Sequence, residues 1–324
     1  MEIISGTIDF QMEESTAVVI GKFDGLHIGH QLLIDRLLEQ KKKGLKAVVF
    51  TFDRSPVSLF LCDGDTYREL CTLQEKREIF EAMGVDVLVE FPMNMQTAAI
   101  SAEEFVTEML QKQLFCKKLI AGEDITFGYK GLGDSRLLKK YSKDCGYDVE
   151  ILEKLLVNYV FSEEASGEEI SSTVIRKAVN AGNISRANRL MNRAFSVRGE
   201  VIHGRQLGGS LLDMPTANVE WPKNKVLPPF GVYFTRVITE DGCYDSITNV
   251  GKKPTVASAE EEILSESYLY DFHGDLYGKE IVVEFYEYLR PEQKFESLEA
   301  LKVQMQKDMS LGRGFWSQKI LNRM

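Results

Sequence analysis

Residues 17–30 have the sequence AVVIGKFDGLHIGH, and this stretch decides the fold of the first half of the chain. Its first four residues form a short apolar run that is typical of a buried strand, and the ten residues that follow contain three glycines. A helical pattern of leucines then extends over residues 31–43, with lysines at its end. A buried strand, a glycine-rich turn and a helix in this order predict the first unit of an open α/β sheet.

Further apolar runs alternate with helical patterns up to about residue 180. This alternation predicts a doubly wound parallel sheet with helices on both faces. The predicted strands are residues 47–52, 86–91 and 118–122, and the predicted helices are residues 72–83 and 101–113.

The second half of the chain has a different pattern of predicted secondary structure. Short β-rich segments separated by glycine-bearing turns predict an antiparallel barrel or sandwich, and a final amphipathic helix is expected over residues 297–309. A helical segment over 171–191, interrupted at residues 181–183, joins the two halves. We therefore expect two domains, residues 1–182 and 183–324. The predicted strands of the second are residues 197–202, 231–238, 244–250, 266–270 and 281–289.

Composition limits the possible partners and the location. The 324 residues include 39 Lys and Arg against 49 Asp and Glu, a net charge of −10, so a basic nucleic-acid surface is not expected. No apolar stretch is long enough for a membrane span, and no signal peptide is visible. The five cysteines form no CxxC pair, which favours reduced thiols in a cytoplasmic protein; a disulfide or metal-bound set is the alternative. The sequence does not indicate an oligomeric state.

The glycine-rich turn has the features of a nucleotide site. Gly25 and Gly29 allow close approach of the backbone to a phosphate, and the helix that follows offers free N–H groups. His27 and His30 lie on one face of the helix start, where two imidazoles can stabilise charge on an α-phosphate during adenylyl transfer. Surface histidines on an ordinary turn, or a zinc site with further ligands, are the alternatives.

These residues also carry a resemblance. His27-Ile-Gly-His30 resembles the H-x-G-H signature of nucleotidyltransferases and class I aminoacyl-tRNA synthetases. The wider frame from Gly21 to Gln31 resembles the bacterial bifunctional riboflavin kinase/FMN adenylyltransferases, or FAD synthetases. An aminoacyl-tRNA synthetase is disfavoured by the length, the acidic charge and the lack of a Lys-Met-Ser-Lys-Ser loop.

Two later segments extend the resemblance. Gly122-Glu-Asp-Ile-Thr-Phe-Gly128 is similar to the family's G-x-D/N-F-x-F-G segment, and Ile170-Ser-Ser-Thr-Val-Ile-Arg176 to its I-S-S-T-x-I-R motif. The resemblance implies that hydroxyls and a guanidinium from the second motif hold the ATP triphosphate, and that His27 and His30 are catalytic. The implied nucleotide-binding residues are Gly21, Phe23, Asp24, Gly29, Asp124, Ser171, Ser172, Thr173 and Arg176.

One segment of the first half departs from the family pattern. The family has T-F-x-P-H-P after its second strand, whereas this chain has Thr51-Phe-Asp-Arg-Ser-Pro56 and lacks the histidine. Asp53 and Arg54 either compensate for that histidine or belong to the loop surface.

The second half resembles riboflavin kinases through several short motifs in family order. They are Pro215-Thr-Ala-Asn218, Pro228-Pro-Phe-Gly-Val-Tyr233, Asn249-Val-Gly-Lys-Lys-Pro-Thr255, Glu266-Ser-Tyr-Leu-Tyr-Asp-Phe272 and Leu289-Arg290. The resemblance implies an antiparallel kinase barrel that uses ATP with Mg²⁺.

Roles in this barrel follow from the same resemblance. Glu266 is the expected base that takes the proton of the ribityl hydroxyl, and a solvated strand glutamate is the alternative. Thr216 and Asn218 are the expected Mg²⁺ ligands, since both offer neutral oxygens. The expected flavin-binding residues are Asn249 and Arg290, and the expected nucleotide-binding glycines are Gly204 and Gly208.

A second departure lies just before Pro215. Asp213 and Met214 stand where the family has Gly-Phe, and the family's arginine is absent, although Arg205 lies nearby. The whole pattern predicts an enzyme that phosphorylates riboflavin to FMN and then adenylylates FMN to FAD, with riboflavin, FMN and ATP as substrates. The alternatives are a paralogue that retains only the adenylyl transfer and a flavin-binding regulator without turnover.

Overall fold

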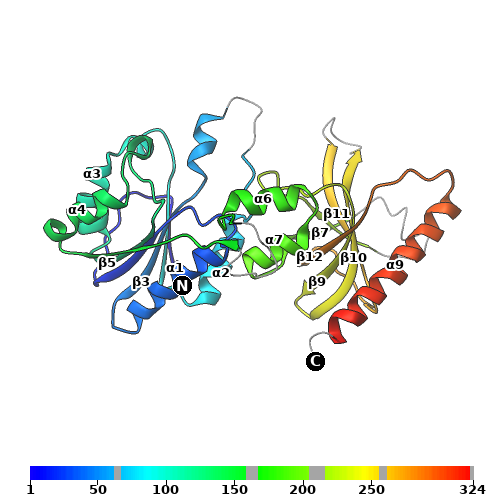
Figure 1. Cartoon of the computed structure of the whole chain (residues 1–324). Coiled ribbons are helices and arrows are strands. Elements are labelled where there is room, and N and C mark those ends of the chain that lie inside the picture. Colours follow the sequence, from blue (N-terminus) through cyan, green and yellow to red (C-terminus); the bar gives the residue numbers. More distant parts are fainter. Residues whose placement is uncertain (62–66, 158–166, 204–215, 255–260, 322–324) are drawn as a thin grey trace. The chain divides into compact units, whose positions relative to one another are not determined.

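The chain forms two compact units. The computed structural model describes residues 1–61, 67–157, 167–203, 216–254 and 261–321, and within these the chain divides into Met1–Val174 and Ile175–Met324 (Figure 1). This division falls inside helix α6 (Ser172–Asn180). The domain boundary expected from the sequence, after residue 182, lies further along the chain and stays a prediction.

The first unit is built on a six-stranded parallel sheet with the order β1-β4-β3-β2-β5-β6. The predicted doubly wound α/β fold is thereby confirmed. The sequence missed β1 and β6, which lie at the two edges and are only partly buried, so neither has a strong apolar pattern. The strands are β1 (Glu2–Ser5), β2 (Thr16–Ile20), β3 (Lys46–Phe52), β4 (Val87–Phe91), β5 (Cys116–Gly122) and β6 (Asp148–Leu152).

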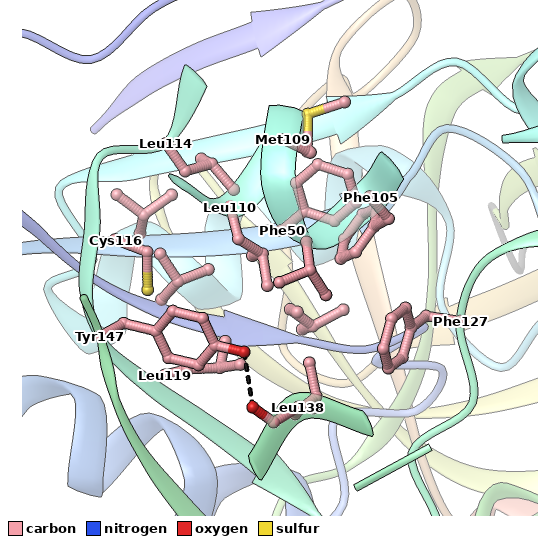
Figure 2. Close-up of a cluster of buried hydrophobic side chains, with 14 of the residues drawn as sticks. Phe50, Phe105, Met109, Leu110, Leu114, Cys116, Leu119, Phe127, Leu138 and Tyr147 are labelled. Carbon is pink, nitrogen blue, oxygen red and sulfur yellow. Dashed lines mark hydrogen bonds between the residues drawn. The ribbon is translucent and has the colours of Figure 1, made fainter. Parts of the chain in front are cut away.

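Alternate residues of the central strands enter two separate cores. Val19 and Val49 pack with helices α1 (Ile28–Lys41) and α2 (Leu73–Met83) on one face of the sheet. Val18 and Phe50 pack on the other face with side chains from residues 102–114 and from α4 (Ser135–Cys145) (Figure 2). Tyr147 closes this second core, and its hydroxyl donates to the carbonyl of Leu138 over 2.7 Å. Helices on both faces make the three-layer packing that the alternating sequence pattern predicts.

The helix predicted over residues 101–113 has an unusual form. Only α3 (Ala102–Glu104) is α-helical, and η3 (Phe105–Gln113) is a π-helix. Its last bond runs from the Leu114 N–H to the Met109 carbonyl, five residues back, over 2.8 Å. The wider turn places Phe105, Val106, Met109 and Leu110 in the core, a spacing that an apolar pattern does not distinguish from an α-helix. The short 3₁₀ turns of this unit are η1 (Pro56–Phe60), η2 (Thr97–Ala99) and η4 (Tyr129–Gly131).

The second unit contains a closed antiparallel barrel with the strand order β10-β11-β8-β7-β12-β9. This confirms the predicted barrel. Residues 217–220, which were not among the predicted strands, form a strand between two neighbours. The strands are β7 (Phe195–Ile202), β8 (Ala217–Glu220), β9 (Gly231–Thr239), β10 (Gly242–Pro254), β11 (Glu261–Leu269) and β12 (Glu280–Pro291).

Fully buried hydroxyl groups link three strands of this barrel. The hydroxyl of Thr235 on β9 lies 2.8 Å from that of Ser246 and 2.7 Å from that of Thr248, both on β10. Thr248 continues the series to Ser267 on β11 over 2.8 Å. All four side chains have no solvent exposure, so each hydroxyl obtains its hydrogen bonds inside the barrel.

Helices complete the second unit. The predicted interruption near residue 182 is confirmed, because α6 is followed by α7 (Ile184–Met191) after a turn in which Gly182 has φ +75°. Helix α9 (Leu298–Leu321) extends well beyond the predicted helix 297–309. Gly312 and Gly314 made this extension hard to predict, since glycine disfavours helix interiors. The structure explains Gly312, because a Cβ there would lie 2.2 Å from the Tyr270 hydroxyl.

The described ranges contain neither a membrane-spanning helix nor a metal-ligating cluster of His, Cys, Asp or Glu. None of the helices in these ranges has the length and apolar character that a bilayer span requires. Within the same ranges, no three His, Cys, Asp or Glu side chains gather closely enough to hold a metal ion.

The buried hydroxyl series leads to a stability prediction. Replacement of Thr235 by valine keeps the shape but leaves Ser246 and Thr248 each short of one partner, so we expect a loss of about 1–3 kcal/mol in the free energy of unfolding. Urea denaturation of the full chain measures it. Thr239→Val, on the exposed end of the same strand, is the control and should change the free energy little. An equal loss in both variants would contradict this role for the hydroxyl series.

Candidate functional site

The two motifs of the first unit meet where the strand order of the sheet reverses. Strand β2 pairs with β3 on one side and with β5 on the other, while the chain visits β3 and β4 before it returns to β5. Residues 21–30 follow the carboxyl end of β2, and residues 122–128 follow that of β5. Open α/β sheets bind ligands at such a reversal.

The turn after β2 has a strained backbone. Phe23 and Leu26 have φ values of +48° and +38°, and Gly25 between them has +77°. Both apolar side chains are fully buried, which holds these conformations in place. A Cβ on Gly25 would lie 2.8 Å from Leu70 Cδ1, so only glycine fits there. Positive φ at non-glycine residues is found preferentially at ligand clamps and active sites.

The two predicted imidazoles stack on one another at the start of α1. The ring centroids of His27 and His30 are 3.7 Å apart with an interplanar angle of 19°. The His30 N–H donates to His27 Nδ1 over 3.3 Å, so His27 caps the helix. Because Nδ1 accepts, neutral His27 carries its proton on Nε2. A Cβ on Gly29 would lie 3.2 Å from the His27 ring, so Gly29 leaves room for this imidazole.

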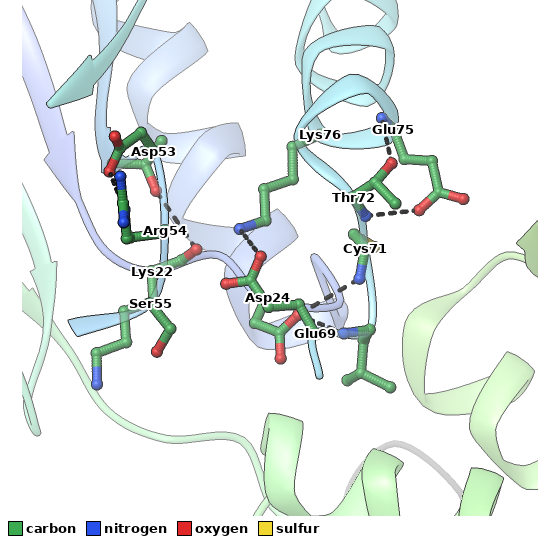
Figure 3. Close-up of polar contacts among 12 residues, drawn as sticks. Lys22, Asp24, Asp53, Arg54, Ser55, Glu69, Cys71, Thr72, Glu75 and Lys76 are labelled. Carbon is green, nitrogen blue, oxygen red and sulfur yellow. Dashed lines mark hydrogen bonds and ion pairs between the residues drawn. The ribbon is translucent and has the colours of Figure 1, made fainter. Parts of the chain in front are cut away.

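Asp24 joins three separate segments. Its Oδ1 accepts from the N–H of Leu70 over 2.7 Å and from that of Cys71 over 3.4 Å (Figure 3). Its backbone carbonyl accepts from the Ser172 hydroxyl over 2.7 Å. The carboxylate is nearly buried and bonded to backbone, so its position suits organisation of the turn; its predicted contact with a nucleotide stays a prediction.

The hydroxyls of the second motif lie at the start of α6. Ser171 Oγ accepts from the Val174 N–H over 3.4 Å and so caps the helix, while Ser172 reaches the Asp24 carbonyl. Thr173 is exposed and Arg176 is half-buried. The α6 N-terminus supplies the N–H groups and positive dipole end that favour a phosphate.

Asp124 is already engaged in an ion pair. Its Oδ2 lies 3.3 Å from Lys154 Nζ, which also hydrogen-bonds Glu169 over 2.6 Å. The Glu169 hydrogen bond, with the nearby Asp124 charge, raises the pKa of Lys154. The sequence did not single out Lys154, which places a cation near the carboxyl end of β5.

The segment that departs from the family pattern makes specific backbone contacts. Asp53 Oδ1 accepts from the Met93 N–H over 2.8 Å, which ties the ends of β3 and β4 together. The Thr51 hydroxyl donates to the Lys22 carbonyl over 3.3 Å (Figure 3). Arg54 is mostly exposed. Asp53 is therefore a structural residue of this loop, and the more exposed Arg54 pairs with it, with Nε 3.8 Å from Asp53 Oδ1.

The candidate residues of the barrel lie on one row of the sheet. Asn218 on β8 pairs with Glu266 on β11, which pairs with Asn249 on β10. The row continues through Val232 on β9 to Arg290 on β12. Directly paired residues of antiparallel strands place their side chains on the same face. The register thus gathers four residues that lie far apart in sequence.

Asn218 fits the cation role that the resemblance implies. Its side chain is 3% exposed, and Nδ2 donates to the Thr216 carbonyl over 3.3 Å. Its Oδ1 has no hydrogen-bond partner among the described residues although it is buried. A buried acceptor without a partner is unfavourable unless a ligand satisfies it, and a neutral oxygen is suited to Mg²⁺.

The two residues predicted to bind flavin have protein partners. Asn249 Nδ2 donates to Glu292 Oε1 over 3.4 Å. The Arg290 guanidinium holds the Asp308 carboxylate of α9 through Nε at 2.9 Å and a second nitrogen at 2.5 Å. Gln304 donates to the same carboxylate over 2.8 Å. The sequence did not identify Asp308, because nothing in a helix pattern shows which buried position faces an arginine.

Gly204 and Gly208 lie outside the described residues. The same holds for Arg205 and for the altered segment with Asp213 and Met214.

Comparison with known proteins covers both units. A family model described as FAD synthetase matches residues 9–173, and one described as riboflavin kinase matches residues 191–315. A protein of Escherichia coli (strain K12) named bifunctional riboflavin kinase/FMN adenylyltransferase is 34% identical over 320 residues, 98% of each chain. A protein of the same name from Listeria monocytogenes is 30% identical over 312 residues, 96% of each chain.

A solved structure supports the fold over nearly the same length. It is described as a macrolide-efflux protein from Streptococcus pneumoniae, and it matches with a TM-score of 0.82 and 29% identity. The match covers 94% of this chain and 96% of that chain. Its description differs from the names of the curated relatives, so only the fold is taken from it.

The Arg290–Asp308 pair leads to a second stability prediction. Asp308→Ala leaves a largely buried guanidinium without its carboxylate, so we expect a loss of about 3–5 kcal/mol in the free energy of unfolding of the second unit. Asp271→Asn is the matched control, because Asp271 also pairs with an arginine of α9 but is 76% exposed, and asparagine tolerates its φ of +56°. That exposed pair should contribute little to the free energy of unfolding. Denaturant titration of both variants measures the two losses in the free energy of unfolding. Similar losses would contradict the assignment of Arg290–Asp308 as the stabilising buried pair.

Proposed function

The chain belongs to the family of bifunctional riboflavin kinase/FMN adenylyltransferases, and on that premise we propose how its residues divide the two reactions. The barrel transfers the γ-phosphoryl group of ATP to riboflavin, which gives FMN and ADP. The α/β unit transfers the adenylyl group of a second ATP to FMN, which gives FAD and pyrophosphate. The family-model matches at residues 9–173 and 191–315 support this division and domain limits of 1–182 and 183–324.

The stacked imidazoles are the observation that supports adenylyl transfer. The attacking group is the phosphate of FMN, which is largely ionised at neutral pH because its second pKa is about 6. The site therefore needs no base, only donors and cations around the α-phosphate of ATP. His27 and His30 stand at the start of α1 with the N–H groups of that helix, and neutral His27 carries its proton on Nε2 because Nδ1 accepts the helix cap bond. Ser171, Ser172, Thr173 and Arg176 would hold the outer phosphates.

Phosphoryl transfer to riboflavin poses the opposite chemical problem. The attacking group is a neutral hydroxyl, whose proton must leave as the oxygen attacks the γ-phosphorus. A carboxylate can accept that proton, and the barrel row contains Glu266 beside Asn218. We assign Glu266 as the base, and this register with Asn218 supports the assignment.

Thr216 and Asn218 would hold Mg²⁺ in the barrel. The cation would neutralise charge on the phosphate oxygens of ATP. The buried Asn218 Oδ1 supports this choice of ligand. Arg290 and Asn249 would border the flavin from the same row, with Arg290 held in place by Asp308. A cytoplasmic location is part of the proposal and rests on the cysteine content.

His30→Ala should remove FAD formation and spare FMN formation. Loss of one donor to a reacting phosphate should lower the rate of FAD formation by about 10²–10³-fold. Purified protein is given ATP and Mg²⁺ with either FMN or riboflavin, and the flavins are separated by chromatography. His273→Ala, an exposed histidine of the other unit, is the control. An equal loss of both activities in His30→Ala would contradict separate sites.

Glu266→Gln should have the reverse effect. Without a base, FMN formation should fall by about 10²–10⁴-fold, while FAD formation from FMN continues. Glu262→Gln, four residues earlier on the same strand, is the control. An unchanged rate of FMN formation would remove Glu266 from the base role.

The same assay on the unaltered protein separates the alternative functions. If the protein makes FAD from FMN but no FMN from riboflavin, it is an adenylyltransferase only. If it makes neither product, it is a flavin-binding regulator.

A further inference from the structure

The ends of strands β2 and β3 are joined beside the stacked imidazoles. Just after β2 ends, the Gly21 N–H donates to the Phe50 carbonyl over 3.2 Å. One residue further along, the Lys22 carbonyl accepts from the Thr51 hydroxyl over 3.3 Å. Lys22 therefore lies beside the loop that follows β3, at the same carboxyl edge of the sheet as the turn that carries the two histidines.

The ammonium of Lys22 differs from the other cations at this edge. Its side chain is exposed, and among the residues that the structure describes it has neither a hydrogen bond nor an ion pair. Lys154, near the end of β5, is held by two carboxylates, and Arg54 Nε lies 3.8 Å from Asp53 Oδ1. A lysine ammonium binds phosphate as a point charge. Of these three cations, Lys22 is the one whose charge no carboxylate offsets.

Ser55 has a buried hydroxyl that the fold does not use. It stands where the family pattern has its histidine, and its side chain is only 5% exposed. It occupies the cap position of η1, where a serine hydroxyl commonly accepts from a backbone N–H, but it makes no such bond. Within the described part of the chain, its Oγ has no hydrogen-bond partner. A buried hydroxyl without a partner is unfavourable, so its presence points to a ligand that satisfies it.

The polar side chains of this loop divide between two sides. Figure 3 shows the Lys22 and Ser55 side chains pointing to the same side of the loop. The Asp53 carboxylate and the Arg54 guanidinium lie together on the opposite side. Asp53 Oδ1 also accepts from the Met93 N–H over 2.8 Å, so two donors offset its charge. The side that presents the ammonium and the hydroxyl is therefore suited to an anion.

We propose that Lys22 and Ser55 bind a phosphate group of a substrate during adenylyl transfer, either the phosphate of FMN or the outer phosphates of ATP. Lys22 supplies the charge, and the Ser55 hydroxyl donates a hydrogen bond. Because this oxygen is enclosed, it meets the phosphate after rotation about the Cα–Cβ bond from one staggered position to another. The inference rests on the proposed adenylyl transfer and deepens it, since Lys22 occupies a variable position of the first motif and Ser55 a departure from the family pattern.

The first test measures the affinity for each substrate separately. Lys22→Met should raise the KM for the substrate whose phosphate it binds by about 10–100-fold, because a hydrogen bond to a charged group is lost. Initial rates of FAD formation are measured with FMN varied at saturating ATP, and then with ATP varied at saturating FMN. A raised KM for FMN assigns the position to the FMN phosphate, and a raised KM for ATP assigns it to the outer phosphates. Unchanged KM values for both substrates would overturn the proposal.

Two further lysine variants separate the local charge from the net charge. Lys22→Arg keeps a cation at the same place and should keep both KM values close to those of the unaltered protein. Lys117→Met removes the same charge from an exposed lysine at the amino end of β5, the opposite edge of the sheet, and should also leave both KM values unchanged. An equal rise of KM in Lys117→Met and Lys22→Met would overturn the proposal.

Ser55→Ala should separate binding from stability. The KM that Lys22→Met raises should rise by about 10-fold, while the free energy of unfolding without substrate should not fall, because the hydroxyl has no bond to lose. Ser58→Ala is the matched control in the same turn, since its hydroxyl donates to the Ser55 carbonyl over 2.6 Å. It should lower the stability in urea denaturation and leave the KM unchanged. An unchanged KM in Ser55→Ala, or a loss of stability equal to that of Ser58→Ala, would overturn the binding role of Ser55.

Nuclear magnetic resonance provides a readout that does not depend on turnover. The imidazole ¹⁵N signals of His27 and His30 report ligands of this unit, because His203 and His273 belong to the other unit. FMN and ATP are titrated separately, and in Lys22→Met the concentration that half-shifts the first two signals should rise by about 10–100-fold for one of them. Such a rise in a protein whose unaltered form makes no FAD would support the phosphate position and refute the proposed function. Equal half-shift concentrations in the two proteins, or no response to either ligand, would overturn the phosphate position itself.

Discussion

The reversal of strand order between β2 and β5 is the constraint on which the first unit depends. Strands β3 and β4 extend the sheet on one side of β2, and β5 extends it on the other side. The chain therefore leaves β2 and β5 in opposite directions, and the edge of the sheet between their two turns stays open. The strained turn at Phe23 and Gly25 can then project His27 and His30 at the carboxyl edge of the sheet. The buried contacts around Asp24 hold a backbone conformation that the turn would not keep by itself.

The two units meet different chemical demands with different residue types. In the division we propose, one nucleophile is already an anion, and the groups assigned to its site are imidazoles, hydroxyls and helix N-termini. The other nucleophile is a hydroxyl, and the barrel provides a carboxylate with amides beside it on one row. An antiparallel barrel can assemble such a row because its register aligns single residues from several strands. A parallel sheet instead assembles its site from the turns that leave its strands.

Sequence patterns predicted the strand–turn–helix unit around residues 17–43 and the barrel, because local periodicity and glycine placement determine both. They did not predict the edge strands β1 and β6, whose exposed sides weaken the apolar pattern, nor the far end of α9, where Gly312 is required by close packing on Tyr270. The motifs identified which residues are of interest but not their partners. That Asp24 binds backbone amides and Arg290 binds Asp308 depends on contacts between distant segments, which spacing along the chain does not reveal.

The π-helix η3 has a consequence for the comparison of related chains. Each of its turns takes about one residue more than an α-helical turn would, and the helix formed by α3 and η3 runs between two anchor points, its cap Ser101 and the buried Leu114. A relative with an ordinary α-helix in this place would reach the same two anchor points with fewer residues. A short gap within residues 105–113 of an alignment would then mark a change of helix type, not a shortened loop, and the residues on either side of it would still occupy equivalent positions.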